Sequence, residues 1–435
     1  MKFVKSNALK PRFNKIIPGG SHTYAKGDDQ FPEFAAPYLV KGKGCKVWDV
    51  DGNEYIEYGM GLRAVTLGHA YPPIVKAAQN QMEKGCNFGR PNPIELECAE
   101  QLLGLIEKAE MVKFAKNGSD VTSAALKLAR AYTGKNMVAI CADHPFFSVD
   151  DWFIGSTAIN AGIPSVISDM TVKFHYNDLD SLENLFQQYP NQIACVFLEA
   201  EKQEPPKEGF FDGLQSICKK YGALLILDEI ITGFRWHLNG AQKMYNINPD
   251  LSTFGKALAN GYSLAALAGK KEIMQLGGLN HDVERVFLLS TTNGAEYHSL
   301  AAAIATMKIY KQEQVIEFLD AQGKKLKDGI TRSISELNLT EYFEVLGKPC
   351  ALVFATKDQN KHHSQAFRTL FLQETINRGL IMPSLVVSYS HSDQFIYHTI
   401  EKIHEALIVY KKALNEGIEK YLIGKPVKPV YRKHN

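Results

Sequence analysis

The segments LLILDEIITGFR (residues 224–235) and FGKALANG (residues 254–261) decide the fold of this chain. The first opens with a short unbroken apolar run, Leu224 to Leu227, which is typical of a strand in a parallel sheet whose two faces are both covered. Two carboxylates, Asp228 and Glu229, follow this run directly. Because open α/β sheets bind ligands beyond the carboxyl ends of their strands, this position predicts a binding site.

Lys256, in the second segment, lies between small and apolar residues. Such surroundings lower the pKa of a lysine because burial disfavours the charged form, and a neutral amine is what a Schiff-base lysine needs. Pyridoxal phosphate has matching requirements, since its aldehyde condenses with a lysine and its ring nitrogen needs a carboxylate partner, here Asp228. The residues alone leave an alternative open, because Asp-Glu after an apolar strand also occurs in α/β enzymes that use Mg²⁺.

The order of short motifs over residues 221–274 resembles the class III pyridoxal-phosphate-dependent aminotransferases, and most closely their glutamate-1-semialdehyde 2,1-aminomutase-like branch. The residues that carry this resemblance are Asp228-Glu229-Ile230, Thr232-Gly233-Phe234-Arg235, Gly240-Ala241-Gln242, Pro249-Asp250-Leu251, Gly255-Lys256 and Asn260-Gly261. The resemblance extends more weakly over nearly the whole chain. It implies that Lys256 forms a Schiff base with pyridoxal 5′-phosphate and later moves a proton, that Asp228 holds the ring nitrogen protonated, and that Ile230 contacts one ring face.

A further segment, Asn117-Gly118-Ser119-Asp120, precedes a strongly helical run at residues 121–132. Ser119 or Asp120 is expected to cap this helix, and the N–H groups at a helix start bind anions. On physical grounds alone, an ordinary capped helix is the simpler interpretation. The family resemblance implies instead a phosphate-binding loop, in which Gly118 and Ser119 hold the cofactor phosphate.

Two more segments match the family pattern with substitutions. Phe146 occupies the place of a tyrosine that stacks on the pyridine ring, and it still offers an aromatic face. An ordinary pair of core phenylalanines, Phe146 and Phe147, is the alternative. The loop at residues 200–207 follows an apolar strand that ends in Glu199, and it lacks the family's usual glycines.

The resemblance also implies residues that reach a second subunit and the substrate. Thr291, with Thr292 as second choice, corresponds to a threonine that crosses a dimer interface to the partner's phosphate, which implies a homodimer with shared active sites. Arg63 and Arg90 lie in segments that resemble active-site loops, where an arginine binds carboxylate or phosphate with two parallel hydrogen bonds. A surface or structural role for either arginine is the alternative.

The composition limits the class of protein. The chain has 435 residues, 45% of them hydrophobic and 22% charged, as expected for one large and one smaller globular domain. The net charge of +2 gives no reason to expect a nucleic-acid partner, and no apolar run approaches membrane-spanning length. The seven cysteines are scattered without a CxxC pair, which argues against a metal site and favours a cytoplasmic location.

The resemblance, and not the composition, implies the domain organisation. We expect a fold-type I pyridoxal-phosphate enzyme with a large α/β domain, built on a mixed, largely parallel sheet, at residues 66–315. A smaller α+β domain is expected from both chain ends, residues 1–65 and 316–435.

The expected activity is that of a class III aminotransferase, which moves an amino group from an amino donor to a carbonyl acceptor in ping-pong half-reactions. An intramolecular aminomutase of the glutamate-1-semialdehyde type is the main alternative, and a non-catalytic protein with this fold is a third. In the resembling aminomutases, a Pro-Ser segment near the C-terminus leads into a longer loop whose glutamate helps to retain the intermediate. Here only the apolar residues 385–387 separate Ser384 from Ser388, and this shortened loop favours release of a keto product.

Overall fold

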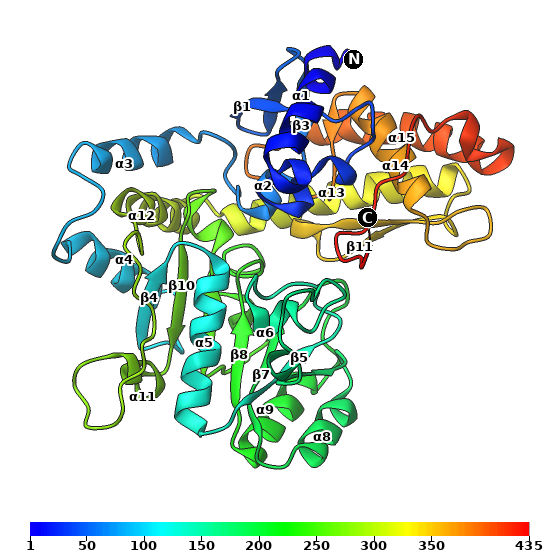
Figure 1. Cartoon of the computed structure of the whole chain (residues 1–435). Coiled ribbons are helices and arrows are strands. Elements are labelled where there is room, and N and C mark those ends of the chain that lie inside the picture. Colours follow the sequence, from blue (N-terminus) through cyan, green and yellow to red (C-terminus); the bar gives the residue numbers. More distant parts are fainter. Residues whose placement is uncertain (435) are drawn as a thin grey trace. The chain divides into compact units, whose positions relative to one another are not determined.

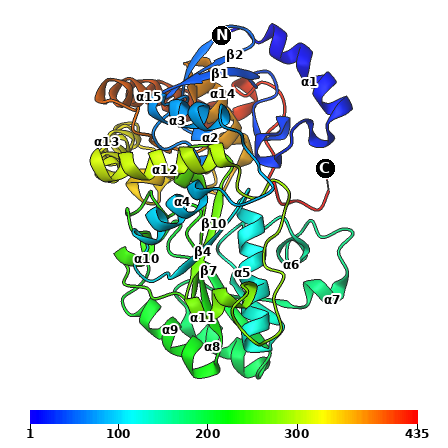
Figure 2. The same ribbon diagram turned by 90° about the vertical axis from the view of Figure 1, so that its left-hand side faces the viewer.

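The structure is a computed structural model of the chain and describes residues 1–434 (Figures 1 and 2). The chain divides into two compact units. The large unit is one continuous segment, Pro72–Ile316, whereas the small unit combines Met1–Tyr71 with the chain from Glu317 onward. The small unit therefore depends on residues from both ends of the chain.

A seven-stranded mixed sheet forms the centre of the large unit. Its strands are β4 (Met111–Ala115), β5 (Met137–Cys141), β6 (Thr171–Phe174), β7 (Ile193–Glu199), β8 (Leu224–Asp228), β9 (Leu251–Phe254) and β10 (Ala265–Gly269). They lie in the order β4-β10-β9-β8-β7-β5-β6. The pairs from β6 to β9 are parallel, and β10 is antiparallel to both of its neighbours. Strand β4 consequently runs in the same direction as β9, so the carboxyl ends of every strand except β10 share one edge.

The central strands are buried because helices cover both faces of the sheet. Every residue of β5, β7 and β8 is buried, as the unbroken apolar run before Asp228 predicts for a parallel strand. Helix α5 (Gly118–Thr133) packs across β4, β7, β8, β9 and β10, and α9 (Phe210–Tyr221) packs on β8. Figure 2 shows α5 and α9 on opposite sides of the sheet. Helix α8 (Leu179–Gln188) lies beside β6 and α9.

Further helices complete the large unit and hold the segment that follows β9. They are α3 (Pro72–Met82), α4 (Pro93–Leu103), α6 (Asp151–Ile154), α7 (Ser165–Ser168), α10 (Ala241–Met244), α11 (Lys271–Met274) and α12 (Tyr297–Gln312). A 3-10 segment, η4 (Lys256–Ala259), follows β9 and packs against α12. The hydroxyl of Tyr310, on α12, donates a hydrogen bond to the carbonyl of Ala257 (2.8 Å), which fixes the backbone next to Lys256.

The small unit contains two sheets. The larger joins β1 (Leu39–Lys43), β2 (Lys46–Asp49), β3 (Glu54–Glu57) and β13 (Leu380–Ile381) in that order, and the smaller pairs β11 (Phe343–Leu346) with β12 (Val353–Thr356). Its helices are α1 (Val4–Ile16), α2 (Met60–Arg63), α13 (Val315–Glu336), α14 (Gln365–Asn377) and α15 (Asp393–Glu416), of which α13 begins at the end of the large unit. Gly52, at φ +89°, lies in the turn of the β2–β3 hairpin, where glycine adopts this conformation without strain.

The sheet of the small unit is stabilised by residues that are far apart in the sequence. Strand β13 pairs in parallel with β3. The buried cluster beneath this sheet includes Phe3, Val47, Tyr55, Ile376 and Ile381. Within residues 1–434, no helix is both long and apolar enough to cross a membrane.

Candidate active site

The candidate site residues lie where the chain leaves the carboxyl ends of neighbouring strands. Gly118 follows β4, Phe146 follows β5, and Lys256 follows β9. Glu199 and Asp228 are the last residues of β7 and β8, and their Cα atoms are register partners across these strands. Because the strands run in one direction, residues far apart in the sequence reach the one edge at which open α/β sheets bind ligands.

The first turn of α5 carries a cap that differs from the sequence prediction. Asn117, rather than Ser119 or Asp120, is the N-cap: its Oδ1 accepts hydrogen bonds from the N–H groups of Ser119 (3.1 Å) and Asp120 (3.3 Å). The carboxylate of Asp120 accepts a hydrogen bond from the N–H of Asn117 (3.2 Å) and completes a capping box. The prediction was wrong because Asn117 is the residue with extended backbone angles, whereas Ser119 and Asp120 already belong to the helix.

Gly118 and Ser119 are held closely by their neighbours. A Cβ atom at position 118 would lie 2.7 Å from Cδ1 of Ile230, so glycine fits there without displacing that side chain. The buried hydroxyl of Ser119 accepts a hydrogen bond from the N–H of Val149 (3.0 Å). The start of α5, Ile230 beyond the end of β8, and Val149 in the loop after β5 therefore meet at one corner of the site.

Asp228 is a buried carboxylate that is difficult to ionise. It accepts hydrogen bonds from the N–H of Ile230 (2.9 Å) and the hydroxyl of Thr253 (3.1 Å). Burial, followed by the charge of Glu199, raises the pKa of Asp228 to about 7, and the two hydrogen bonds and Lys256 offset this only in part. A positive charge placed against Asp228 would stabilise its ionised form, so this carboxylate suits a protonated ring nitrogen.

Glu229, the neighbouring acid, has a different set of partners. It accepts hydrogen bonds from the N–H groups of Ala241 (2.9 Å) and Gln242 (2.8 Å) and from the hydroxyl of Thr232. Burial raises the pKa of this carboxyl as well. These bonds commit Glu229 to holding the turn at α10, so two acids that are adjacent in the sequence have separate tasks.

Lys256 has an unusual backbone conformation. Its φ is +45°, in the left-handed region. This conformation costs a non-glycine residue about 1–3 kcal/mol, and residues that adopt it are concentrated at functional sites. Burial opposes ionisation of both Glu199 and Asp228, and the positive charge of Lys256 favours ionisation of both. Lys256 therefore lies within electrostatic reach of the two acids at the ends of β7 and β8.

Sequence reasoning missed two neighbours of Glu199. Lys202 Nζ lies 3.0 Å from Glu199 Oε1, and the N–H of Glu199 donates a hydrogen bond to Nδ1 of His144 (3.0 Å). Burial lowers the pKa of His144 to about 4, so its imidazole is neutral at neutral pH. Burial has the largest effect on the pKa of Glu199 and raises it, but Lys202, His144 and Lys256 together outweigh burial, so the pKa lies below its ordinary value. A lysine three residues after a strand-end acid was the signal that could have identified Lys202.

The two phenylalanines after β5 have different environments. Phe147 is 1% exposed and meets Phe197 edge to face, with ring centroids 5.1 Å apart. Phe146 is 45% exposed and meets Phe153 edge to face at 5.7 Å. The alternative of a core pair therefore holds for Phe147 and not for Phe146, whose ring has a face available for stacking.

The remaining predicted residues lie outside the segments that follow β5, β7, β8 and β9. Arg63 belongs to the small unit, where it ends α2 with φ +70°. Arg90 is exposed in the connection between α3 and α4. Thr291 is exposed in the loop before α12, and the next carbonyl, that of Thr292, accepts a hydrogen bond from the amide of Asn87 (2.9 Å).

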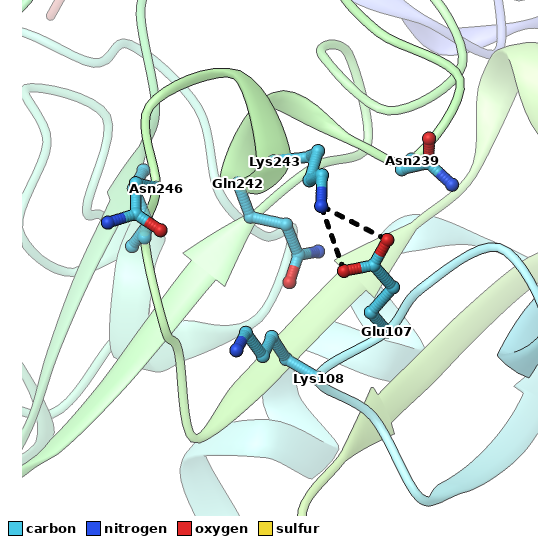
Figure 3. Close-up of a pocket in the computed structure, with 7 residues that line it drawn as sticks. Glu107, Lys108, Asn239, Gln242, Lys243 and Asn246 are labelled. Carbon is cyan, nitrogen blue, oxygen red and sulfur yellow. Dashed lines mark hydrogen bonds and ion pairs between the residues drawn. The ribbon is translucent and has the colours of Figure 1, made fainter.

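A separate polar pocket lies beside α10 (Figure 3). Its lining residues are Glu107, Lys108, Asn239, Gln242, Lys243, Asn246 and Ile247. The ammonium group of Lys243 lies 3.0 Å from a carboxylate oxygen of Glu107. The cavity volume of about 90 Å³ is well below the roughly 300 Å³ of small-molecule sites. The lining includes none of the predicted site residues, so this pocket is not the candidate active site.

Comparison with known proteins identifies the family. The family model for aminotransferase class-III matches residues 24–407. A 3-aminobutyryl-CoA aminotransferase from Cloacimonas acidaminovorans (strain Evry) is 31% identical over 424 residues, which cover 95% of this chain and 99% of that protein. A glutamate-1-semialdehyde 2,1-aminomutase from Desulforamulus reducens is 31% identical over 426 residues, which cover 93% and 98% of the two chains.

A solved structure supports the same relationship. The pyridoxal-phosphate internal aldimine form of the FumI protein from Sphingopyxis sp. MTA144 has a TM-score of 0.86 and 26% sequence identity, and covers 95% of this chain and 98% of that one. The match thus includes both units, the mixed sheet and the segments at its carboxyl edge. The chain belongs to the class-III aminotransferases, a family of fold-type I enzymes that use pyridoxal 5′-phosphate.

Proposed function

We propose that this protein is a transaminase that takes an amino group from one substrate and gives it to another in a separate half-reaction. The observation that carries this proposal is the segment at residues 385–387, where the resembling aminomutases have a longer acidic loop. All three residues are fully buried, and the N–H groups of Leu385 and Val386 donate to the carbonyls of Leu352 (2.9 Å) and Tyr58 (3.0 Å). The glutamate that helps to retain the intermediate in those aminomutases has no counterpart in this short, buried segment, which favours release of the carbonyl product.

The residues at the sheet edge fit the cofactor of the family. Asp228 is a buried carboxylate that gains from an adjacent positive charge, and Lys256 lies within its electrostatic reach. Gly118 leaves space at the start of α5 that a Cβ atom could occupy only by displacing Ile230. When bound, pyridoxal 5′-phosphate supplies an aldehyde that reacts with amines and a ring that accepts electrons.

Four residues act on the reacting end of the cofactor in this proposal. Lys256 holds the cofactor through Nζ and, once released, uses the same nitrogen to move the proton of the substrate's Cα. Asp228 accepts a hydrogen bond from the ring nitrogen and keeps its proton in place. Ile230 and Phe146 enclose the two faces of the ring and exclude water from it.

The phosphate end completes the proposed site in a homodimer. Gly118 and Ser119 lie at the positive end of α5, which favours an anion. The N–H of Ser119 is bonded to the side chain of Asn117, so the N–H of Gly118 and the hydroxyl of Ser119 are the groups that would hold the phosphate, and the partner subunit's Thr291 supplies a further hydroxyl. The chain segment between α11 and α12, which contains Thr291, also has two exposed apolar side chains, Leu279 (80% exposed) and Phe287 (71% exposed), and these support a subunit contact by this segment.

We extend the proposal to the location of the protein and to its substrate. The seven cysteines are all free thiols, which supports a reducing compartment such as the cytoplasm. Arg63 and Arg90 are the candidates for binding an anionic group of the substrate. The relatives' names make 3-aminobutyryl-CoA the first amino donor to test, and glutamate-1-semialdehyde the first mutase substrate.

The test is to mix the enzyme with an accepted amino donor and no acceptor. A transaminase releases one equivalent of carbonyl product per site and retains the aminated cofactor, and the Lys256→Ala variant serves as the control that releases no product. If glutamate-1-semialdehyde alone is instead converted completely to 5-aminolevulinate without a second substrate, the enzyme is an aminomutase. Its activity would then match that of the Desulforamulus reducens relative, which is 31% identical.

A further inference from the structure

One buried carboxylate, that of Glu199, lies within reach of two lysines. Its side chain is 4% exposed and forms an ion pair with Lys202, whose side chain is 21% exposed. Lys256 acts on the same carboxylate through its charge. Because an amine must lose its proton before it attacks an aldehyde, a carboxylate that paired with Lys256 alone would hold that lysine in its unreactive ammonium form.

The position of Lys202 is determined by the residues on either side of it. The carbonyl of Ala200 accepts a hydrogen bond from the hydroxyl of Tyr176 (2.6 Å). The buried carboxylate of Glu201 accepts hydrogen bonds from the indole of Trp236 (2.8 Å) and from the hydroxyl of Tyr245. These bonds fix the start of the loop at residues 200–207, so the ammonium group of Lys202 is directed to Glu199 by the fold.

The other groups around Glu199 do not replace Lys202. His144 contacts the backbone N–H of Glu199 and is neutral at neutral pH, because burial lowers its pKa to about 4. Asp228, at the adjacent strand end, adds negative charge once it is ionised. Lys202 is therefore a positive group that contacts the carboxylate directly.

We propose that Lys202 is a positioning residue that holds the carboxylate of Glu199 and thereby leaves the nitrogen of Lys256 able to lose its proton. The proposal rests on the assignment of Lys256 as the cofactor-binding lysine. It adds a second lysine to the site, one that acts through Glu199 without contacting the reacting atoms. The effect on Lys256 is electrostatic. It therefore depends on the positive charge of residue 202, and it occurs only when residue 199 is negatively charged.

The test is a pH titration of the holoenzyme that follows the absorbance change caused by protonation of the Lys256 nitrogen. In Lys202→Met the uncompensated Glu199 favours the protonated nitrogen, and the midpoint should rise by about one pH unit, the lower end of the effect of a nearby opposite charge. Glu199→Gln should lower the midpoint, because the negative charge is lost. The double variant should return to within about 0.3 of the wild type.

Two controls separate charge from structure. Lys202→Arg keeps the charge and should keep the midpoint, and Lys207→Met removes a charge from an exposed position of the same loop and should leave the midpoint unchanged. An unmoved midpoint in Lys202→Met, or a double variant that stays shifted, overturns the proposal. If Lys202→Met does not bind the cofactor, Glu199→Gln is the test: a lower midpoint supports the proposal, and an unchanged midpoint overturns it. If the absorbance change persists in Lys256→Ala, the assignment of Lys256 itself fails, and this outcome is distinct from the others.

Discussion

Replacing Asp228 by asparagine should stabilise the protein after its cofactor has been removed, and the gain should increase with pH. Burial raises the pKa of this carboxyl from an ordinary 3.8 to about 7. A carboxyl whose pKa is raised in the folded state stabilises the fold fully below pH 3.8, where it is protonated in both states. This stabilisation is lost as the pH rises from 3.8 through 7. Asparagine carries no charge at either pH, so the variant avoids this loss.

The size of the effect follows from the two pKa values. A difference of about three between them corresponds to roughly 4 kcal/mol once Asp228 is fully ionised. Part of this cost is already present at pH 5, so the advantage of Asp228→Asn should increase by roughly 2–3 kcal/mol between pH 5 and pH 8. For a unit of the size of Pro72–Ile316, the melting temperature of Asp228→Asn should exceed that of the wild type by roughly 5 °C more at pH 8 than at pH 5.

The assay is thermal unfolding of the full-length, cofactor-stripped protein at both pH values, with exposed Asp169→Asn as the matched control. The control should show no pH-dependent difference from the wild type. Adding pyridoxal phosphate should raise the melting temperature of the wild type more than that of Asp228→Asn, because the ring nitrogen then pairs with the carboxylate. A destabilised variant at pH 8, or a difference that does not change with pH, would refute the reasoning.

Three further predictions address the other site residues. Lys256→Ala should abolish the yellow colour and the adduct trapped by borohydride, and an adduct that maps to another lysine would show that the assignment is wrong. Gly118→Ala should weaken cofactor binding about tenfold while the melting temperature of the cofactor-free protein changes little, because the new Cβ atom displaces the flexible end of Ile230; unchanged affinity would contradict the close fit. Thr291→Ala should speed cofactor loss from a dimer, and a fully occupied, active monomer by sedimentation would exclude the shared site.

Local patterns were sufficient to predict two central strands of the large sheet, β7 and β8. The apolar run before Asp228 and the similar run before Glu199 both form fully buried parallel strands. An uninterrupted apolar run is stable in a strand only where both faces are covered, so the pattern also predicts helices on both sides. A strand-end acid then lies at the ligand-binding edge, because all the parallel strands end there.

The pairing of side chains around the site was not predictable in this way. The sequence shows Asp228 and Glu229 as equivalent neighbours, and only the turn at α10 draws Glu229 away. The cap at Asn117 and the ion pair of Lys202 depend on where the backbone turns out of a helix or a strand, and a shift of one residue changes the partner. Such contacts depend on tertiary packing, and a sequence pattern does not contain the positions of side chains in the folded protein.

The order of the two units along the chain has a consequence for biosynthesis. The hairpin β2–β3 leaves the ribosome early, but its parallel neighbour β13 and the apolar partners Ile376 and Ile381 follow about 320 residues after Tyr55. At roughly 5–20 residues per second, this interval lasts about 15 to 65 seconds. During that time the large unit is synthesised to its last residue, Ile316, while Val47 and Tyr55 lack much of their core and one edge of the hairpin is open to pairing with other chains. The nascent N-terminal segment is thus the part of this enzyme that most needs a chaperone.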